Sequence, residues 1–165
     1  MTGKQTPVIP GIYRQHILAG VVIAGHQPVG IDTHGGGTGA ERSHITATFG
    51  SQLMITLYDT VAATVYAQAW LAQGNQWVFD KLPPEISVAH GQGSIGPALS
   101  VRAHGNDERK ARYDSAPRTA IIRVGSLTWT VRDKTATGSM LDAWRHIADL
   151  GPIILGRQAP PLRRR

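Results

Sequence analysis

Residues 50–70 read GSQLMITLYDTVAATVYAQAW, a stretch in which a turn, a strand and a helix are expected to follow one another directly. Residues 125–144 read GSLTWTVRDKTATGSMLDAW and repeat that order. With Gln52 left unpaired, twenty positions align and eight carry the same residue in both stretches. The identical pairs are Gly50/Gly125, Ser51/Ser126, Leu53/Leu127, Thr56/Thr130, Asp59/Asp133, Ala62/Ala136, Ala69/Ala143 and Trp70/Trp144. The sequence therefore predicts an internal duplication of one hairpin–helix unit.

Each unit is preceded by a segment with the composition of a β-strand and contains a second such segment after the turn. His44–Phe49 and Thr119–Val124 are rich in Ile, Val, Thr and Phe, and a Gly-Ser turn follows each of them. Leu53–Tyr58 and Leu127–Arg132 then alternate apolar with polar or less apolar residues, as strands do when one face is buried. We expect Leu53 and Leu127 to lie on equivalent buried faces.

An aspartate separates each strand from the helix that follows it. Asp59 and Asp133 suit the N-cap position, where a carboxylate accepts a backbone N–H bond. Helices are expected over Thr60–Gln73 and Thr135–Leu150, the second ending at Gly151-Pro152. The expected apolar stripes are Val61, Val65, Ala69 and Leu71 in the first helix and Met140, Leu141, Trp144 and Ile147 in the second. Paired catalytic carboxylates are the alternative for the two aspartates, but capping explains both without chemistry.

The rest of the chain extends each unit to the order β-β-β-β-α, which predicts an α+β fold with antiparallel sheets and one helix per repeat. The additional strands are expected at Ile12–Leu18, Val21–Ala24, Ile86–His90 and Ala98–Ala103. Two long connections, Gly25–Arg42 and His104–Arg118, are expected to be mobile loops. The predicted organisation is a flexible segment 1–10, a first repeat 11–79, a linker 80–85 containing two prolines, a second repeat 86–155 and a basic disordered tail 156–165.

Composition limits the classes of function. The net charge of +6, with clustered arginines and lysines, favours a polyanionic partner, since neutralising phosphates releases counterions. The lack of cysteine excludes disulfides, thiolate metal sites and cysteine nucleophiles. Residues 1–10 have no apolar run of the length found in signal peptides, so we expect a cytoplasmic protein without a membrane partner.

Motifs for cofactors and catalysis are weak. Residues 91–96 match Gly-x-Gly-x-x-Gly, but a proline and a strand-like alternation follow where a dinucleotide site needs a helix. The glycines of 35–39 lack the Gly-Lys-Ser/Thr of a phosphate-binding loop. Seven histidines lack the close spacing of zinc sites, and no serine elbow is present. We therefore expect no cofactor, no metal and no enzymatic activity.

The doubled β-β-β-β-α order, combined with basic character, resembles the PUR and whirly groups of single-stranded nucleic-acid-binding proteins, although no diagnostic motif of either is present. The resemblance implies that each helix covers one face of a sheet and that the opposite face binds DNA or RNA. The residues predicted to form that face are Thr46, Thr48, Thr56, Tyr58, Arg118, Arg123, Thr128, Thr130, Arg132 and Lys134. Arginine would contact phosphate, threonine would donate hydrogen bonds, and Tyr58, Trp77 or Tyr13 would stack on bases.

Two other classes of function remain open. One is a homo-oligomeric scaffold or assembly protein that pairs through sheet edges. The other is a small-molecule binder or enzyme with a pocket between the repeats, closed by the glycine-rich segments 35–39 and 91–96.

Overall fold

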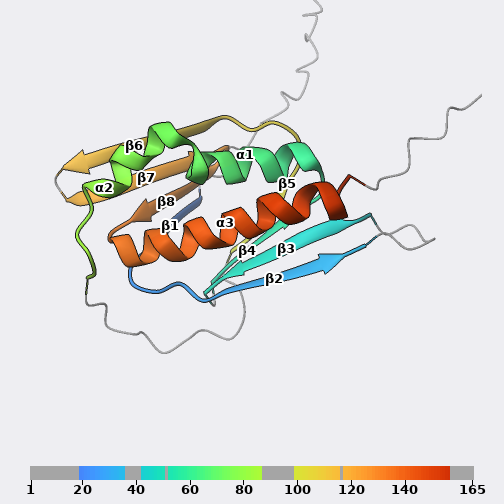
Figure 1. The fold of residues 1–165 in the computed structure, drawn as a ribbon, viewed down its shortest axis with the longest axis horizontal. Helices are drawn as coiled ribbons and strands as arrows, with labels where there is room; N and C mark the ends of the chain where they lie inside the picture. Colours follow the sequence, from blue (N-terminus) through green and yellow to red (C-terminus); the bar gives the residue numbers. More distant parts are fainter. Residues whose placement is uncertain (1–18, 36–41, 51, 87–98, 116, 157–165) are drawn as a thin grey trace, which may run out of the picture.

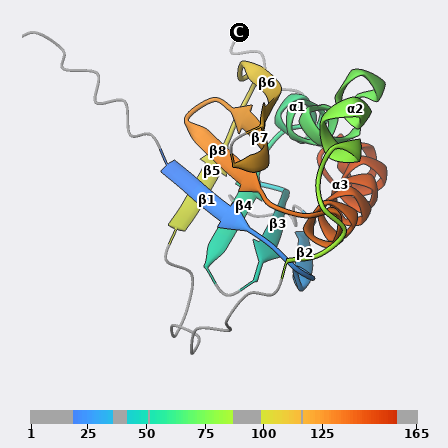
Figure 2. The same ribbon diagram turned by 90° about the vertical axis from the view of Figure 1, so that its left-hand side faces the viewer.

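The computed structural model describes residues 19–35, 42–50, 52–86, 99–115 and 117–156. Over these ranges the protein is α+β, with two four-stranded sheets covered by helices on one side (Figures 1 and 2). Sheet A has the strand order β1-β8-β7-β6, and sheet B has the order β2-β3-β4-β5. The strands are β1 (Ala19–Ile23), β2 (Val29–His34), β3 (His44–Phe49), β4 (Leu53–Leu57), β5 (Leu99–Ala103), β6 (Arg109–Ser115), β7 (Arg118–Val124) and β8 (Leu127–Val131).

Each sheet contains one edge strand from the other half of the chain: β1 lies in sheet A, and β5 lies in sheet B. The expected β-β-β-β-α order, with four consecutive strands in each half, did not include this exchange. β1 pairs in parallel with β8, placing Val21 opposite Trp129, and β5 pairs in parallel with β4, placing Val101 opposite Ile55. The other neighbours in both sheets are antiparallel hairpins. The sheets are therefore mixed, and each half of the chain contributes to both.

The two connections expected to be mobile loops contain edge strands, which corrects that prediction. β2 lies within Gly25–Arg42, and β6 lies within His104–Arg118. Their sequences, VGIDTH and RKARYDS, are more polar than those of the central strands because one flank of each strand is open. Charged edge strands of this kind also oppose pairing with other chains.

Two long helices cover the inner faces of the sheets. α1 (Thr60–Leu71) packs on β6 and β7 of sheet A, whereas α3 (Lys134–Ile154) packs on β2 and β3 of sheet B. The two helices lie side by side and run in opposite directions (Figure 1). A short 3-10 turn, η1 (Gln73–Asn75), and a short helix, α2 (Gln76–Asp80), follow α1.

Both predicted N-caps are confirmed, whereas two details of the helices differ from expectation. α3 continues one turn beyond the expected stop and contains Pro152. Proline lacks an N–H donor, but the last turn still closes with a bond from Leu155 N to Gly151 O at 2.8 Å. In α1 the buried face is made mainly of alanines and aromatic residues, so Val61 is 48% exposed instead of joining the apolar stripe.

A cluster of aromatic rings lies within the largely aliphatic core between the helices and the sheets. Trp129 of β8 lies at its centre, with its ring edge-on to Trp70 at 5.6 Å and to Trp144 at 6.4 Å between centroids. Tyr66 contacts two of these tryptophans, and Phe79 of α2 stacks on Trp70 at 5.9 Å. The prediction that Trp70, Trp129 and Trp144 are packing residues is confirmed, since none is more than 1% exposed.

Tyr66 makes the stability of this core sensitive to alkaline pH. Burial, together with the negative charge of Asp107, raises the pKa of Tyr66 from 10.0 to about 12. Between these two pKa values Tyr66 keeps its proton in the folded protein but has lost it in the unfolded chain. The stability present below pH 10 therefore falls as the pH rises toward 12. The free energy of unfolding should fall by up to about 3 kcal/mol over this window from Tyr66 alone. Urea titrations at several pH values should give a shallower decline for Tyr66→Phe than for the wild type, and equal slopes would contradict this account.

Asp59 and Asp133 also join the two halves of the chain. Asp59 Oδ1 accepts from Ala62 N at 2.7 Å, and its Oδ2 accepts from Gly105 N in the second half at 2.8 Å. In the same way, Asp133 Oδ1 accepts from Ala136 N at 2.7 Å, and its Oδ2 accepts from Gly25 N in the first half at 2.8 Å. Gly25 and Gly105 have φ angles of +68° and +65°, a left-handed conformation that favours glycine. Each carboxylate thus holds a helix start against a turn of the opposite half.

The segment before residue 87 covers the start of α3. Pro83 O accepts from Lys134 N at 2.9 Å, and Pro84 O accepts from Thr135 N at 3.2 Å. Ile86 N donates to Asp133 Oδ2 at 3.0 Å. These bonds help to explain why Asp133 is fully buried, at 0% exposure, whereas Asp59 is only half-buried.

Several sequence predictions fall outside the described residues. They include the strand at 12–18, nearly all of the one at 86–90, the glycine motif at 91–96, most of the glycine cluster at 35–39, and the terminal segments 1–10 and 157–165.

Candidate nucleic-acid interface

The face of sheet A that points away from the helices is basic. Strand register places Lys110, Arg123 and Thr128 in one row across β6, β7 and β8. The next row contains Arg112, Ile121 and Thr130, and it continues to the exposed Val22 of β1. All three cations are exposed. We call Lys110, Arg112, Arg123, Thr128 and Thr130 the basic face.

A shallow hollow of about 220 Å³ lies within the basic face and is lined by its three cations, Ile121 and Thr128. Arg123 is oriented by a bond from its Nε to Gly125 O at 2.9 Å, which leaves the terminal guanidinium nitrogens for other partners. Thr128 supplies a hydroxyl to the lining of the hollow, and Ile121 supplies an apolar surface. The arrangement can hold an anionic group over a partly apolar surface.

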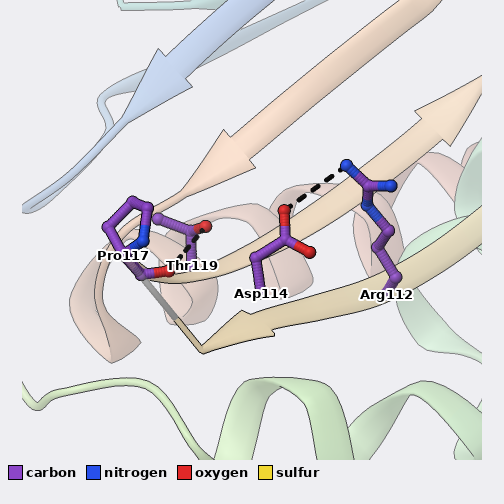
Figure 3. A network of polar contacts seen from close by, with 4 residues as sticks. All are labelled: Arg112, Asp114, Pro117 and Thr119. Carbon is purple, nitrogen blue, oxygen red and sulfur yellow. Dashed lines mark hydrogen bonds and ion pairs between the residues drawn. The ribbon is translucent and has the colours of Figure 1, made fainter.

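Two acidic residues border the basic face: the exposed Glu108, which precedes β6 with the outward alternation of Lys110, and Asp114 near the other end of β6. Asp114 Oδ2 lies 3.4 Å from Arg112 Nη2, and the two side chains are 40% and 62% exposed, respectively (Figure 3). Nearby, Thr119 Oγ1 donates to Pro117 O at 3.3 Å, so this threonine serves the β6–β7 turn instead of the binding surface. An exposed ion pair of this kind contributes little stability, and Arg112 can exchange Asp114 for a phosphate.

Sequence reasoning missed Lys110 and Arg112 because β6 was assigned to a loop. The signal was present in the alternation of Lys110, Arg112 and Asp114 with the half-buried Ala111 and Tyr113. An alternation of this kind is typical of a strand with one solvated face.

The predicted residues of the second half divide between the basic face and other surfaces. Arg123, Thr128 and Thr130 belong to the basic face. Arg132 follows β8 with the same outward alternation and is exposed. Arg118 is exposed but has the opposite alternation on β7, and Lys134 begins α3, so neither belongs to the basic face. Helix capping, not the sheet, sets the position of Lys134.

The predicted residues of the first half lie on the outer face of sheet B. Thr46 and Thr48 are half-buried there, and Thr46 Oγ1 lies 3.4 Å from Thr56 Oγ1. Thr56 is only 7% exposed, which corrects its assignment to an accessible surface. Its central position, between Thr46 of β3 and Arg102 of β5, explains the burial. The structure therefore divides the predicted site between two sheets.

Four aromatic rings cross one end of sheet B, and we call them the ring row. His34 stacks on His44 at 4.4 Å, His44 lies 5.7 Å from Tyr58, and Tyr58 stacks on His104 at 4.7 Å. His34 and His104 are exposed, while the two inner rings are half-buried. Only Tyr58 was predicted at this position, because the register that aligns the histidines depends on β2 and on the parallel β4–β5 pair.

Other candidate chemistry is explained by structural roles. Asp59 and Asp133 both accept backbone N–H bonds as helix caps. His26 Nδ1 lies 3.1 Å from Ser139 Oγ, but that hydroxyl also accepts from Gln27 N and donates to Thr135 O. These contacts connect the first turns of α3 to residues 26–27, which is a structural role for Ser139.

Two negative findings apply to the described part of the chain. It contains no group of three or more histidines or carboxylates arranged to hold a metal ion. Nor does any helix in these ranges have the length and apolar character needed to cross a membrane.

A groove of about 230 Å³ between α1 and α3 offers the small-molecule alternative some support. It is lined by Ala63, Ala67, Ala148, Gly151, Pro152 and neighbouring polar residues of α1. It has no charged group and lies on the helical side, away from the basic face. Its chemistry would suit an apolar ligand or a packed helix more than an anion.

No protein-family model matches the sequence, and no curated protein and no solved structure is significantly similar to the chain.

Proposed function

We propose that the protein binds single-stranded DNA or RNA through the basic face of sheet A. The observation that carries this proposal is the grouping of Lys110, Arg112 and Arg123 around one hollow. Three exposed cations on two adjacent strands form a positive patch, which is the usual electrostatic feature of nucleic-acid binding. The net charge of +6 adds long-range attraction for a polyanion.

The neighbouring groups favour a flexible strand over a duplex. Guanidinium planes can stack on unpaired bases, Thr128 and Thr130 can donate hydrogen bonds, and Ile121 offers an apolar contact to a base. The sheet presents these groups as a broad, shallow surface, and they lie in rows that a splayed strand can follow. We therefore expect preference for single strands without strong sequence specificity.

Arg123→Ala tests the proposal. Loss of one phosphate contact should weaken binding of a labelled single-stranded oligonucleotide about fivefold at low salt and reduce the slope of log affinity against log salt by about 0.7. Fluorescence anisotropy over a series of salt concentrations measures both quantities. A Lys110→Ala/Arg112→Ala/Arg123→Ala variant should reduce the slope by about three times as much.

Arg118→Ala is the matched control, because Arg118 lies on the same strand with the same charge but the opposite alternation. It should change affinity much less than Arg123→Ala. Equal losses for the two variants would show that net charge, not the basic face, governs binding. No binding by the wild type at low salt would refute the function itself.

An ancestral duplication is the second part of the proposal. It is supported by the eight identical pairs and by the matched caps, in which each aspartate binds the glycine turn of the other half. Exchange of edge strands between two copies of one unit would produce the observed sheets. On this view sheet B corresponds to sheet A, and the cations of sheet A are a later specialisation.

Assembly through sheet edges is the competing function, supported by Val22, which is 66% exposed on the edge strand β1. Light scattering with and without oligonucleotide separates the two. A nucleic-acid-binding protein should gain the mass of bound strand, whereas a scaffold should show a higher oligomer without any nucleic acid.

A further inference from the structure

Trp77 differs from the other three tryptophans of the chain because it is open to solvent. It is 49% exposed, whereas the others are at most 1% exposed. Its neighbours on α2 anchor that helix to the core, since Val78 is fully buried and Phe79 stacks on Trp70. A large aromatic side chain is therefore held at the surface by a firmly packed support.

A lysine connects Trp77 to sheet A. Lys81 Nζ lies 4.5 Å from the centre of the Trp77 ring and 5.2 Å from the centre of the Tyr113 ring on β6. Both distances are within the range of cation–π attraction. Lys81 is exposed and Tyr113 is half-buried, so the ammonium meets both rings at the surface. An exposed ammonium on a flexible stem can exchange a ring for a phosphate at little cost.

The basic face and Trp77 are brought close together by β6. α2 packs against this strand (Figure 1), and Tyr113 follows Arg112 with the opposite alternation. Lys110 and Arg112 thus lie on one side of β6, and Tyr113 lies on the side of α2. Because β6 is an edge strand of sheet A, a flexible chain that crosses its open flank passes from the basic face to α2.

The chemistry of this corner matches the two parts of a nucleotide. An indole can stack on any base, because every base has a π-face, and the adjacent ammonium can bind the phosphate. Carboxylates in the same region have local partners. Asp80 Oδ1 accepts from Gln76 Nε2 at 3.0 Å, and Asp114 pairs with Arg112. Lys81 therefore has no printed ion pair to give up on binding a phosphate among the described residues.

We propose that Trp77 is a base-stacking site for single-stranded nucleic acid, which rests on the function proposed above. The strand leaves the basic face over the edge of β6, and one base stacks on the indole of Trp77. Lys81 moves from the ring to the adjacent phosphate. The basic face thus supplies the salt-dependent part of the affinity, and Trp77 adds a contact that does not depend on salt.

The test compares a single-stranded oligonucleotide with an abasic oligomer of the same length, which keeps the phosphates and lacks the bases. Trp77→Ala should weaken binding of the oligonucleotide about tenfold and leave binding of the abasic oligomer unchanged. The slope of log affinity against log salt should stay at the wild-type value, because stacking releases no counterions. Trp77→Phe should keep most of the affinity.

Two further measurements guard against indirect effects. Ile153→Ala is the matched control, since Ile153 is 53% exposed on α3, and it should leave both affinities unchanged. Circular dichroism checks that each variant folds. Bound bases should also quench the fluorescence of the exposed tryptophan, and Trp77→Phe should remove this quenching. Equal losses on the two oligomers, or no loss on either, would overturn the proposal.

Failure of Trp77 can be told apart from failure of the basic face. Arg123→Ala should weaken binding of both oligomers and lower the salt slope, because it removes a phosphate contact. If Trp77→Ala binds like the wild type while Arg123→Ala is weakened, the stacking site is refuted and the proposed function stands. If the wild type binds neither oligomer, both are refuted.

Discussion

Trp129→Ala is expected to be the most destabilising single substitution in the described core, lowering the free energy of unfolding by about 3–5 kcal/mol. Trp129 is fully buried, and its ring lies edge-on to Trp70, Trp144 and Tyr66. It lies where sheet A meets both long helices, through Trp70 and Tyr66 of α1 and Trp144 of α3. Truncation would leave a cavity that rigid aromatic neighbours cannot refill.

Urea denaturation followed by circular dichroism measures this loss. Trp129→Phe should cost much less, about 1–2 kcal/mol, because it keeps a ring and removes an indole N–H that has no hydrogen-bond partner among the described residues. Trp77→Ala is the control, since Trp77 is 49% exposed on α2 and Lys81 Nζ lies over its ring, 4.5 Å from the centroid. A loss for Trp129→Ala no larger than that for Trp77→Ala would contradict the packing described above.

Asp133→Ala should lower the free energy of unfolding by about 3–4 kcal/mol, which is large for a single polar side chain. Its carboxylate accepts from Ala136 N, Gly25 N and Ile86 N, in three separate parts of the chain. Removing it would uncap α3 and leave donors of the other two segments without a partner in a site that water does not reach. The loss should therefore exceed that of an ordinary helix cap.

Asp59→Ala supplies the comparison within the same molecule. Asp59 has the same cap and the same glycine contact but no third donor among the described residues, and it is only half-buried. Its replacement should cost about 1–2 kcal/mol, since water can reach the freed groups. Equal losses at the two positions would show that the linker contact through Ile86 adds nothing.

The candidate site was only partly predictable because it depends on the assignment of edge strands. Arg123, Thr128 and Thr130 were found from the alternation of β7 and β8, whose apolar halves are strong. Lys110 and Arg112 were missed because an edge strand needs few apolar residues and resembles a charged loop. The ring row was missed for a related reason: its histidines come from four-strand register, while each of them taken singly has no distinctive neighbours.

The sequence by itself determined the local elements: the β3–β4 and β7–β8 hairpins, the capped helices and the buried tryptophans. These follow from short-range periodicity, turn glycines and side chains that cap their own helix, so residues within about one turn or one strand contain the necessary information. Only the tertiary structure decided that β1 and β5 exchange between halves, that α1 covers sheet A while α3 covers sheet B, and that three cations share one face. Those outcomes depend on which strand edges pair over long separations, and pairing there is set by the packing of the whole core.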